Sequence, residues 1–383
     1  MHSIERKSVI VSAFFLNTAG FAVFSFLAVY LNIYLNLKGW ETVVILSTLT
    51  ISSRGLPFFL GLAGDRLGFK NLMISGLLLR SLGFYGLAVS SEFGWLVLFS
   101  VLIGAGAACY EPSALAYFAS QPDPVLKRKT FLYLNISLNA GAVAGPLLGG
   151  LLLTIDPVIP FYLSSLTFLA LSILQFFLLS SSESKKSRFS CSESLADIIH
   201  NKQYLYFCLT MIFYWFLFAQ LTVAFPLYMY ALTESNQWVS FVITMNALTG
   251  ITLMILLKGV FQTVHPFTLI RIGKLLTACS FLMVAAYPGS YWLLVCVGIF
   301  TIGETMILPS SDYAVSLYSS TQNDAAYYGF SDFSFAIGAT LGNFAAISLL
   351  TGESSQLYPW IFFTLIGVSG FLLSLKLSEK SKV

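Results

Sequence analysis

Long apolar runs separated by short polar connections dominate this sequence and restrict what it can fold into. Most runs hold about 20 residues or more, the length that an α-helix needs to cross the hydrocarbon core of a bilayer. Lipid admits only helices or closed β-barrels, and these runs are far too long for barrel strands. Only 10% of the residues are charged, against roughly 25% in soluble domains. We therefore predict an all-α polytopic membrane protein.

Twelve segments meet the length requirement, and a polar stretch divides them into two sets of six. They are residues 8–35, 41–63, 71–90, 94–118, 128–154 and 159–180, followed by 203–231, 238–260, 267–287, 292–317, 326–350 and 357–377. The polar stretch is the one long connection. We predict an N-terminal six-helix bundle over 1–180, a cytoplasmic linker over 181–202 and a C-terminal six-helix bundle over 203–383.

Basic residues concentrate on one side of the predicted membrane. Seventeen of the 20 Lys and Arg residues lie in alternate connections or near the termini, and the opposite side holds only Lys38. The positive-inside rule then places both termini and the linker in the cytoplasm, in a cell inner membrane. The seventeen are Arg6, Lys7, Arg66, Lys70, Lys127, Arg128, Lys129, Lys185, Lys186, Arg188, Lys202, Lys258, Arg271, Lys274, Lys376, Lys380 and Lys382.

An internal repeat supports the division into two halves. Shifting the sequence by 197 residues superposes five pairs, namely Pro112 with Pro309, Gly141 with Gly338, Gly145 with Gly342, Asn135 with Asp332 and Gly76 with Gly273. Parallel repeats related by an axis along the membrane normal are a transporter design, with the substrate site near the bilayer midplane. The repeat therefore favours a carrier over a channel.

A short motif follows the second predicted helix. The sequence GLAGDRLGFK over 61–70 places Gly61, Asp65, Arg66, Gly68 and Lys70 in the pattern G-x-x-x-D-R-x-G-[RK]-[RK], from which only Phe69 departs. This motif resembles the cytoplasmic-loop signature of the major facilitator superfamily. Glycines permit a tight turn and close helix approach, and the two charges can form contacts that break as the helices rock. We expect these residues to act in conformational gating.

The fifth predicted helix carries a second motif. The sequence GAVAGPLLGG over 141–150 holds Gly141, Gly145, Pro146 and Gly149 and resembles the superfamily's antiporter signature, which marks exporters more than importers. Small residues spaced four apart permit close packing, and proline can bend the helix. The resemblance implies a gating role, while a generic small-residue packing face is the alternative.

Three further stretches resemble the MdtH/LmrP-like multidrug exporters of the twelve-helix drug:proton antiporter branch. They are GLLLRSLGF, GAGAACYEPSALA and YYGFSDFSFAIGATLG. The resemblance implies the superfamily fold in two pseudo-symmetric bundles, and proton-coupled export of small amphipathic or cationic compounds by alternating access. One departure concerns the fourth helix, where Ser100 replaces the arginine usual in the family, so any proton role of that arginine is not carried over.

We single out six ionisable residues inside the predicted spans as functional candidates. They are Arg54, Arg80 and Glu111 in the first half, and Glu304, Asp312 and Asp332 in the second. Each costs at least roughly 2.5–3.5 kcal/mol at a helix centre unless it is paired or wetted, so these residues are candidates for proton coupling and substrate binding. Structural ion pairing, for example of Arg80 with Glu111, is the alternative for some of them.

Other classes of function find little support. The sequence contains no GxxxxGK[ST] nucleotide-binding loop, its five cysteines are scattered without CxxC spacing, and its net charge is only +3. We expect no enzymatic activity, metal, cofactor or nucleic acid, and a functional monomer whose partners are protons, a small-molecule substrate and the lipid bilayer. The competing interpretation is proton-coupled transport, in either direction, of an anionic metabolite such as a carboxylate siderophore, bound by Arg54 and Arg80.

Overall fold

A computed structural model of the chain describes residues 3–27, 30–120, 123–179, 191–319, 324–350 and 357–377. These residues form helices and no strands, which confirms the all-α prediction. The chain divides into two compact units. The first unit is Met1–Ala196 with Ser319–Asp332, and the second unit is Asp197–Tyr318 with Phe333–Val383.

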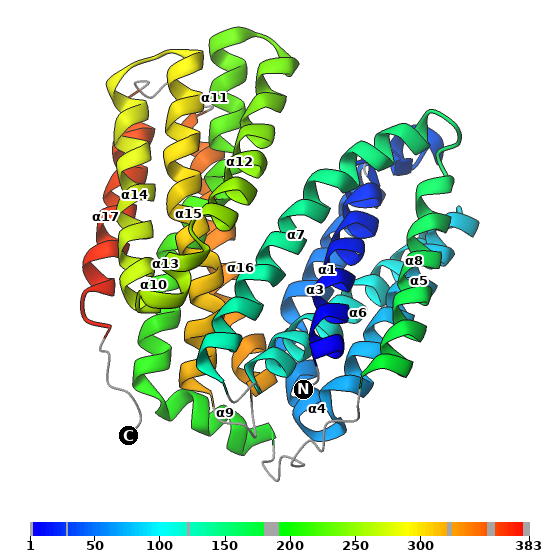
Figure 1. Cartoon of the computed structure of the whole chain (residues 1–383). Coiled ribbons are helices and arrows are strands. Elements are labelled where there is room, and N and C mark those ends of the chain that lie inside the picture. Colours follow the sequence, from blue (N-terminus) through cyan, green and yellow to red (C-terminus); the bar gives the residue numbers. More distant parts are fainter. Residues whose placement is uncertain are drawn as a thin grey trace. The chain divides into compact units, whose positions relative to one another are not determined.

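The helices of the described residues follow one another along the chain (Figure 1). The first unit contains α1 (Ser3–Phe24), the π-helical turn η1 (Tyr30–Tyr34), α3 (Gly39–Gly55), α4 (Pro57–Leu67), α5 (Phe69–Val89), α6 (Phe93–Ala119), α7 (Pro124–Leu153) and α8 (Ile159–Leu178). The second contains α10 (Lys202–Phe218), η2 (Ala219–Leu221), α11 (Ala224–Thr233), α12 (Asn236–Leu256), α13 (Lys258–Thr263), α14 (Pro266–Ala286), α15 (Ser290–Tyr318) and α17 (Tyr358–Ser374). The units divide within α9 (Cys191–His200) and again within α16 (Asp324–Leu350).

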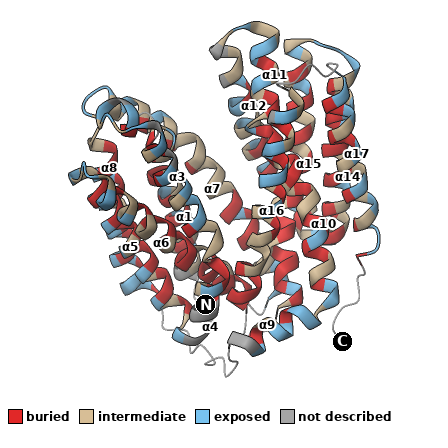
Figure 2. Ribbon diagram, turned by 180° about the vertical axis from the view of Figure 1, so that it is seen from behind, coloured by how far each residue is buried: buried red, intermediate tan, exposed pale blue. Residues whose placement is uncertain are grey.

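All twelve predicted segments coincide with helices. Within the described residues, nine helices are long and apolar enough to cross a membrane, and two shorter apolar helices, Phe241–Leu256 and Tyr358–Ser374, fall in the eighth and twelfth segments. Large apolar side chains on these helices are exposed, among them Leu147 (67% exposed) and Phe177 (76% exposed). Figure 2 shows exposed residues along the helices of both units. So much exposed apolar surface is unstable in water but suits a lipid environment. The chain is a multi-pass membrane protein.

Two predicted segments are interrupted rather than continuous. The second consists of α3, which ends at Gly55, and α4, which begins at Pro57. Proline has no N–H to donate to the preceding turn but fits the first position of a new helix. The seventh segment passes through the short η2 turn before α11, which contains Pro226.

The glycines of the antiporter-like motif face α1. A Cβ atom at Gly145 would lie 2.7 Å from Phe21 Cβ and 2.8 Å from Thr18 O, and a Cβ at Gly141 or Gly149 would also collide with the α1 backbone. Pro146 lies inside α7. The motif therefore brings two helices into backbone contact, as small-residue faces do in membranes.

The internal repeat of 197 residues is also visible in the packing, because matching glycine pairs make the same helix contact in each unit. Gly76 of α5 lies against the carbonyl of Gly106 of α6, and Gly273 of α14 lies against the carbonyl of Gly303 of α15. Each member of the second pair follows its counterpart by 197 residues. The same close helix pair is thus present in both units.

Gly145→Ala is expected to destabilise the protein by about 1–3 kcal/mol, because overpacking forces α1 and α7 apart. Gly150→Ala is the matched control on the same helix, since its Cβ would meet only Phe26 Cζ, at 3.6 Å. Thermal unfolding in detergent measures both. Equal melting temperatures for the two variants would contradict the packing argument.

Candidate functional site

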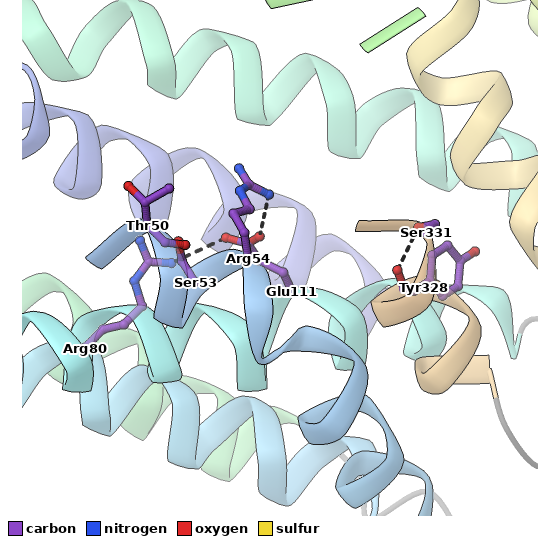
Figure 3. A network of polar contacts seen from close by, with 7 residues as sticks. All are labelled: Thr50, Ser53, Arg54, Arg80, Glu111, Tyr328 and Ser331. Atoms are coloured by element: carbon purple, nitrogen blue, oxygen red, sulfur yellow. Dashed lines mark hydrogen bonds and ion pairs between the residues drawn. The ribbon is translucent and has the colours of Figure 1, made fainter. Parts of the chain in front are cut away.

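Three of the predicted charged residues meet inside the first unit (Figure 3). Arg54 extends from α3, Arg80 from α5 and Glu111 from α6. Arg54 Nη1 lies 3.9 Å from Glu111 Oε2, and Arg80 Nη1 lies 4.0 Å from Glu111 Oε1. One carboxylate is therefore paired with two guanidinium groups, and both distances exceed the roughly 3.2 Å limit of a good hydrogen bond.

Arg80 is buried because it belongs to the packed face of α5. This face includes Leu77 and Phe84, which lie three or four residues from it along the helix. The Arg80 guanidinium carbon lies 4.5 Å from the centroid of the Phe168 ring on α8, a cation–π contact that partly offsets the loss of water. Within the described residues its Nε and Nη1 atoms have no hydrogen-bond partner. These two nitrogens are therefore buried donors without a hydrogen-bond acceptor in the described structure.

The three residues differ in access to solvent. The Arg80 side chain is only 5% exposed, whereas those of Arg54 and Glu111 are 37% and 42% exposed. Two positive charges and one negative charge leave a formal surplus of one positive charge. This arrangement can attract an anionic group as well as hold Glu111 in place.

The loop motif runs from within α4 through Gly68 into the first turn of α5. Gly68 has a positive φ of 91° and begins α5, so the tight turn that we predicted from this glycine is present. Lys70 Nζ lies 5.4 Å from the ring centroid of Phe176. The side chains of Asp65 and Arg66 lie outside the described residues, so their predicted charge contacts stay a prediction.

The first turns of α16 pack on α4 within the first unit. A Cβ at Gly61 would collide with the backbone of Ala325, and a Cβ at Gly329 would collide with the backbone of Pro57. The Phe58 and Phe330 rings lie 5.9 Å apart, edge to face. Asp332 is half-buried on the same helix, two turns after Ala325. Gly61 thus serves the close helix approach that we predicted for it.

Glu304 and Asp312 both lie on α15 in the second unit. Glu304 is only 6% exposed and accepts a 2.5 Å hydrogen bond from Asn246 Nδ2 of α12. Among the described residues, no basic group lies within 4.0 Å of its carboxylate. Asp312 is half-buried two turns further on. Glu304 is therefore a buried acid held by a neutral side chain.

Two polar residues of the second unit were missed by the sequence analysis. Lys274, counted there with the cytoplasmic connections, is 2% exposed inside α14, and its Nζ donates to Thr210 O at 2.7 Å. The interpretation of Lys274 as a connection residue is wrong, although its position inside the predicted 267–287 segment was a warning. Asn246 was passed over because it carries no charge.

Comparisons with known proteins agree with this architecture. The family model of the Major Facilitator Superfamily matches residues 8–342. Multidrug resistance protein MdtH of Shigella sonnei (strain Ss046) is 25% identical over 359 residues, which cover 91% of this chain and 88% of the relative. The protein of the same name from Escherichia coli (strain K12 / DH10B) matches to the same extent.

A solved structure has the same fold. The crystal structure of the human organic anion transporter MFSD10 (TETRAN) aligns with a TM-score of 0.80 and covers 98% of this chain and 100% of that chain, at 14% sequence identity. At such low identity the likeness concerns the fold alone. Together with the two-unit helical architecture, it confirms the fold class that we predicted.

Proposed function

Because the chain belongs to the Major Facilitator Superfamily and is a secondary transporter, we propose that it exports small amphipathic or cationic compounds in exchange for protons, by alternating access. The observation that carries the proposal is Glu304, a buried carboxylate without a basic group within 4.0 Å among the described residues. A carboxylate in such a position favours neutralisation, either by a proton or by a cationic substrate. The MdtH relatives, by their name multidrug resistance proteins, support the same substrate class.

A second candidate function is favoured by the first unit. Arg54 and Arg80 share one carboxylate, Glu111, and two nitrogens of Arg80, Nε and Nη1, have no hydrogen-bond partner in the described structure. Arginine binds carboxylates in a bidentate geometry. Proton-coupled transport of an anionic metabolite, such as a carboxylate siderophore, would use this surplus positive charge.

Several finer features belong to the proposal. We place the protein in the cell inner membrane with both termini in the cytoplasm, acting as a monomeric carrier without enzymatic activity. Residues 1–180 and 203–383 would rock against each other about the 181–202 linker. Asp65 and Arg66 of the loop motif would form charge contacts that break in each cycle, and Gly61, Gly68 and Lys70 would shape that gate. Gly141, Gly145, Pro146 and Gly149 would let α7 move along α1.

Reconstituted liposomes test the coupling directly. A gradient of one pH unit supplies about 1.4 kcal/mol per proton, which supports about tenfold accumulation of a monovalent cation exchanged for one proton. We expect ethidium to accumulate about tenfold in such liposomes and a protonophore to abolish the gradient of ethidium. Citrate, as the carboxylate probe, should not accumulate.

Two outcomes would change the proposal. Transport of ethidium that ignores both the pH gradient and the membrane potential would defeat proton coupling. Accumulation of citrate in place of ethidium would favour the anionic function. Liposomes without protein provide the background in each case.

A further inference from the structure

A polar bridge joins α12 and α15 in the second unit. Asn246 on α12 donates both amide hydrogens to α15, one to Glu304 Oε2 at 2.5 Å and one to Thr301 Oγ1 at 3.0 Å. Thr301 uses its own proton to donate to Val297 O at 2.7 Å, so its oxygen acts as an acceptor towards Asn246. Two acceptors therefore orient the amide with its nitrogen towards α15.

The strength of this bridge depends on the charge of Glu304. An ionised carboxylate only accepts hydrogen bonds, and bonds to a charged acceptor are roughly twice as strong as neutral ones. When Glu304 takes up a proton, the contact loses this charge assistance. The bridge is therefore strong in the ionised state and weak in the protonated state.

Packing between α12 and α15 is looser next to the bridge than packing between α14 and α15. Gly250 lies one turn after Asn246, and a Cβ atom there would be 3.6 Å from Thr301 Cγ2 and 3.8 Å from Thr305 Oγ1, which are ordinary contact distances. The Thr305 hydroxyl is buried without a partner among the described residues. By contrast, Gly273 of α14 and Gly303 of α15 leave no room for a Cβ. α15 is thus in backbone contact with α14, whereas it meets α12 at ordinary contact distances, through the apolar cluster around Val242 and through this polar bridge.

Few other titratable groups face Glu304. Tyr214 of α10 lies within electrostatic range of both Glu304 and Asp312, and its buried hydroxyl has no partner in the described part of the chain. Lys274 of α14 is turned towards Thr210 O, and Tyr228 of α11 packs on Trp360. Asn246 is therefore the side chain in direct polar contact with Glu304.

We propose that Asn246 is a positioning residue, which ties α12 to α15 through ionised Glu304 and releases α12 when Glu304 takes up a proton. The inference rests on the proposed proton exchange at Glu304. It adds that proton uptake by Glu304 loosens the contact between α12 and α15. A single neutral side chain would thus convert the charge of the acid into a helix movement.

The test is the pH profile of ethidium transport by the full-length protein in liposomes. Asn246→Leu removes the donor to the carboxylate. A hydrogen bond favours the ionised form of a charged group, and its loss shifts the pH at which that group takes up a proton by about one unit or more. We expect the pH of half-maximal transport to rise by about one unit. Asn246→Ala, which also removes the amide donor but fills less space than leucine, provides a second variant and should show the same rise.

Gln220→Leu is the matched control. Gln220 is also a buried amide of the second unit, and it donates to Phe216 O at 2.8 Å and Gly342 O at 3.0 Å. Its loss should lower the melting temperature and leave the pH midpoint unchanged. A purely structural role of Asn246 predicts the same pattern for Asn246→Leu.

The outcomes separate this inference from the proposed function. A wild-type midpoint in both Asn246 variants, with pH-dependent transport by the wild type and loss of transport in Glu304→Gln, overturns only the role of Asn246. Transport that is independent of pH in the wild type, and unaffected by Glu304→Gln, overturns the proposed function and the inference together. A raised midpoint in the Asn246 variants with an unchanged control supports the inference.

Discussion

Glu304→Gln is expected to reduce pH-driven accumulation of ethidium to the background of liposomes without protein. Glutamine keeps the shape of glutamate and can still accept the hydrogen bond from Asn246, but it can neither bind nor release a proton. The protein should therefore fold normally. Exchange of a neutral compound down its own gradient should continue, because that process needs no coupling ion.

Arg54→Gln separates the two candidate substrate classes. If the substrate is cationic, the loss of this half-exposed arginine should have a mild effect, and Glu304→Gln should abolish transport. If the substrate is an anionic metabolite, the order of the two effects should reverse. Both variants are measured against ethidium and citrate in the same liposomes.

Measuring Glu304→Gln and Arg54→Gln together also tests whether these two residues belong to the transport site at all. If neither substitution changes transport of either probe, these charges serve the fold rather than the cycle. Normal monodispersity of both proteins in detergent is the necessary control. Loss of both activities in an aggregated variant would be read from that control as misfolding.

The fold was predictable because the bilayer leaves few alternatives. Helix length and the requirement to satisfy every backbone group were enough to place all twelve segments on helices. The roles of the glycines of the two motifs were partly predictable, since a tight turn at Gly68 and close packing at Gly145 follow from the absence of a side chain, although the sequence did not name α1 as the partner of Gly145. Both features depend on local sequence.

The candidate site was only partly predictable, because contacts between distant residues set it. The sequence places Arg54, Arg80 and Glu111 within spans, but which helices meet is decided by packing over the whole unit. Periodicity could have shown that Lys274 lies within a span, yet the acceptor of its ammonium group is a carbonyl 64 residues away. Asn246 gave no signal, since a neutral amide in an apolar helix is unremarkable until its acid partner is known.

Glu111→Gln is expected to destabilise the first unit by about 2 kcal/mol. Removing one partner of a buried ion pair costs about 3–5 kcal/mol, because the other charge is left unpaired, and we reduce this figure because Glu111 is 42% exposed and solvent screens it. Among the described residues, the buried guanidinium of Arg80 would then keep its cation–π contact with Phe168 next to the like charge of Arg54, with no carboxylate paired to it. Glu92→Gln, at the exposed start of α6, is the control and should leave stability unchanged.

A double-mutant cycle decides whether Arg80 and Glu111 stabilise each other. Arg80→Met keeps most of the stem that packs inside the unit and removes the charge, so the Arg80→Met/Glu111→Gln protein no longer contains an unpaired buried cation. Its melting temperature should therefore exceed that of Glu111→Gln alone, as coupled residues are not additive. Additive losses in stability would show that the carboxylate is not needed to hold Arg80, which leaves Glu111 free to act on protons or substrate.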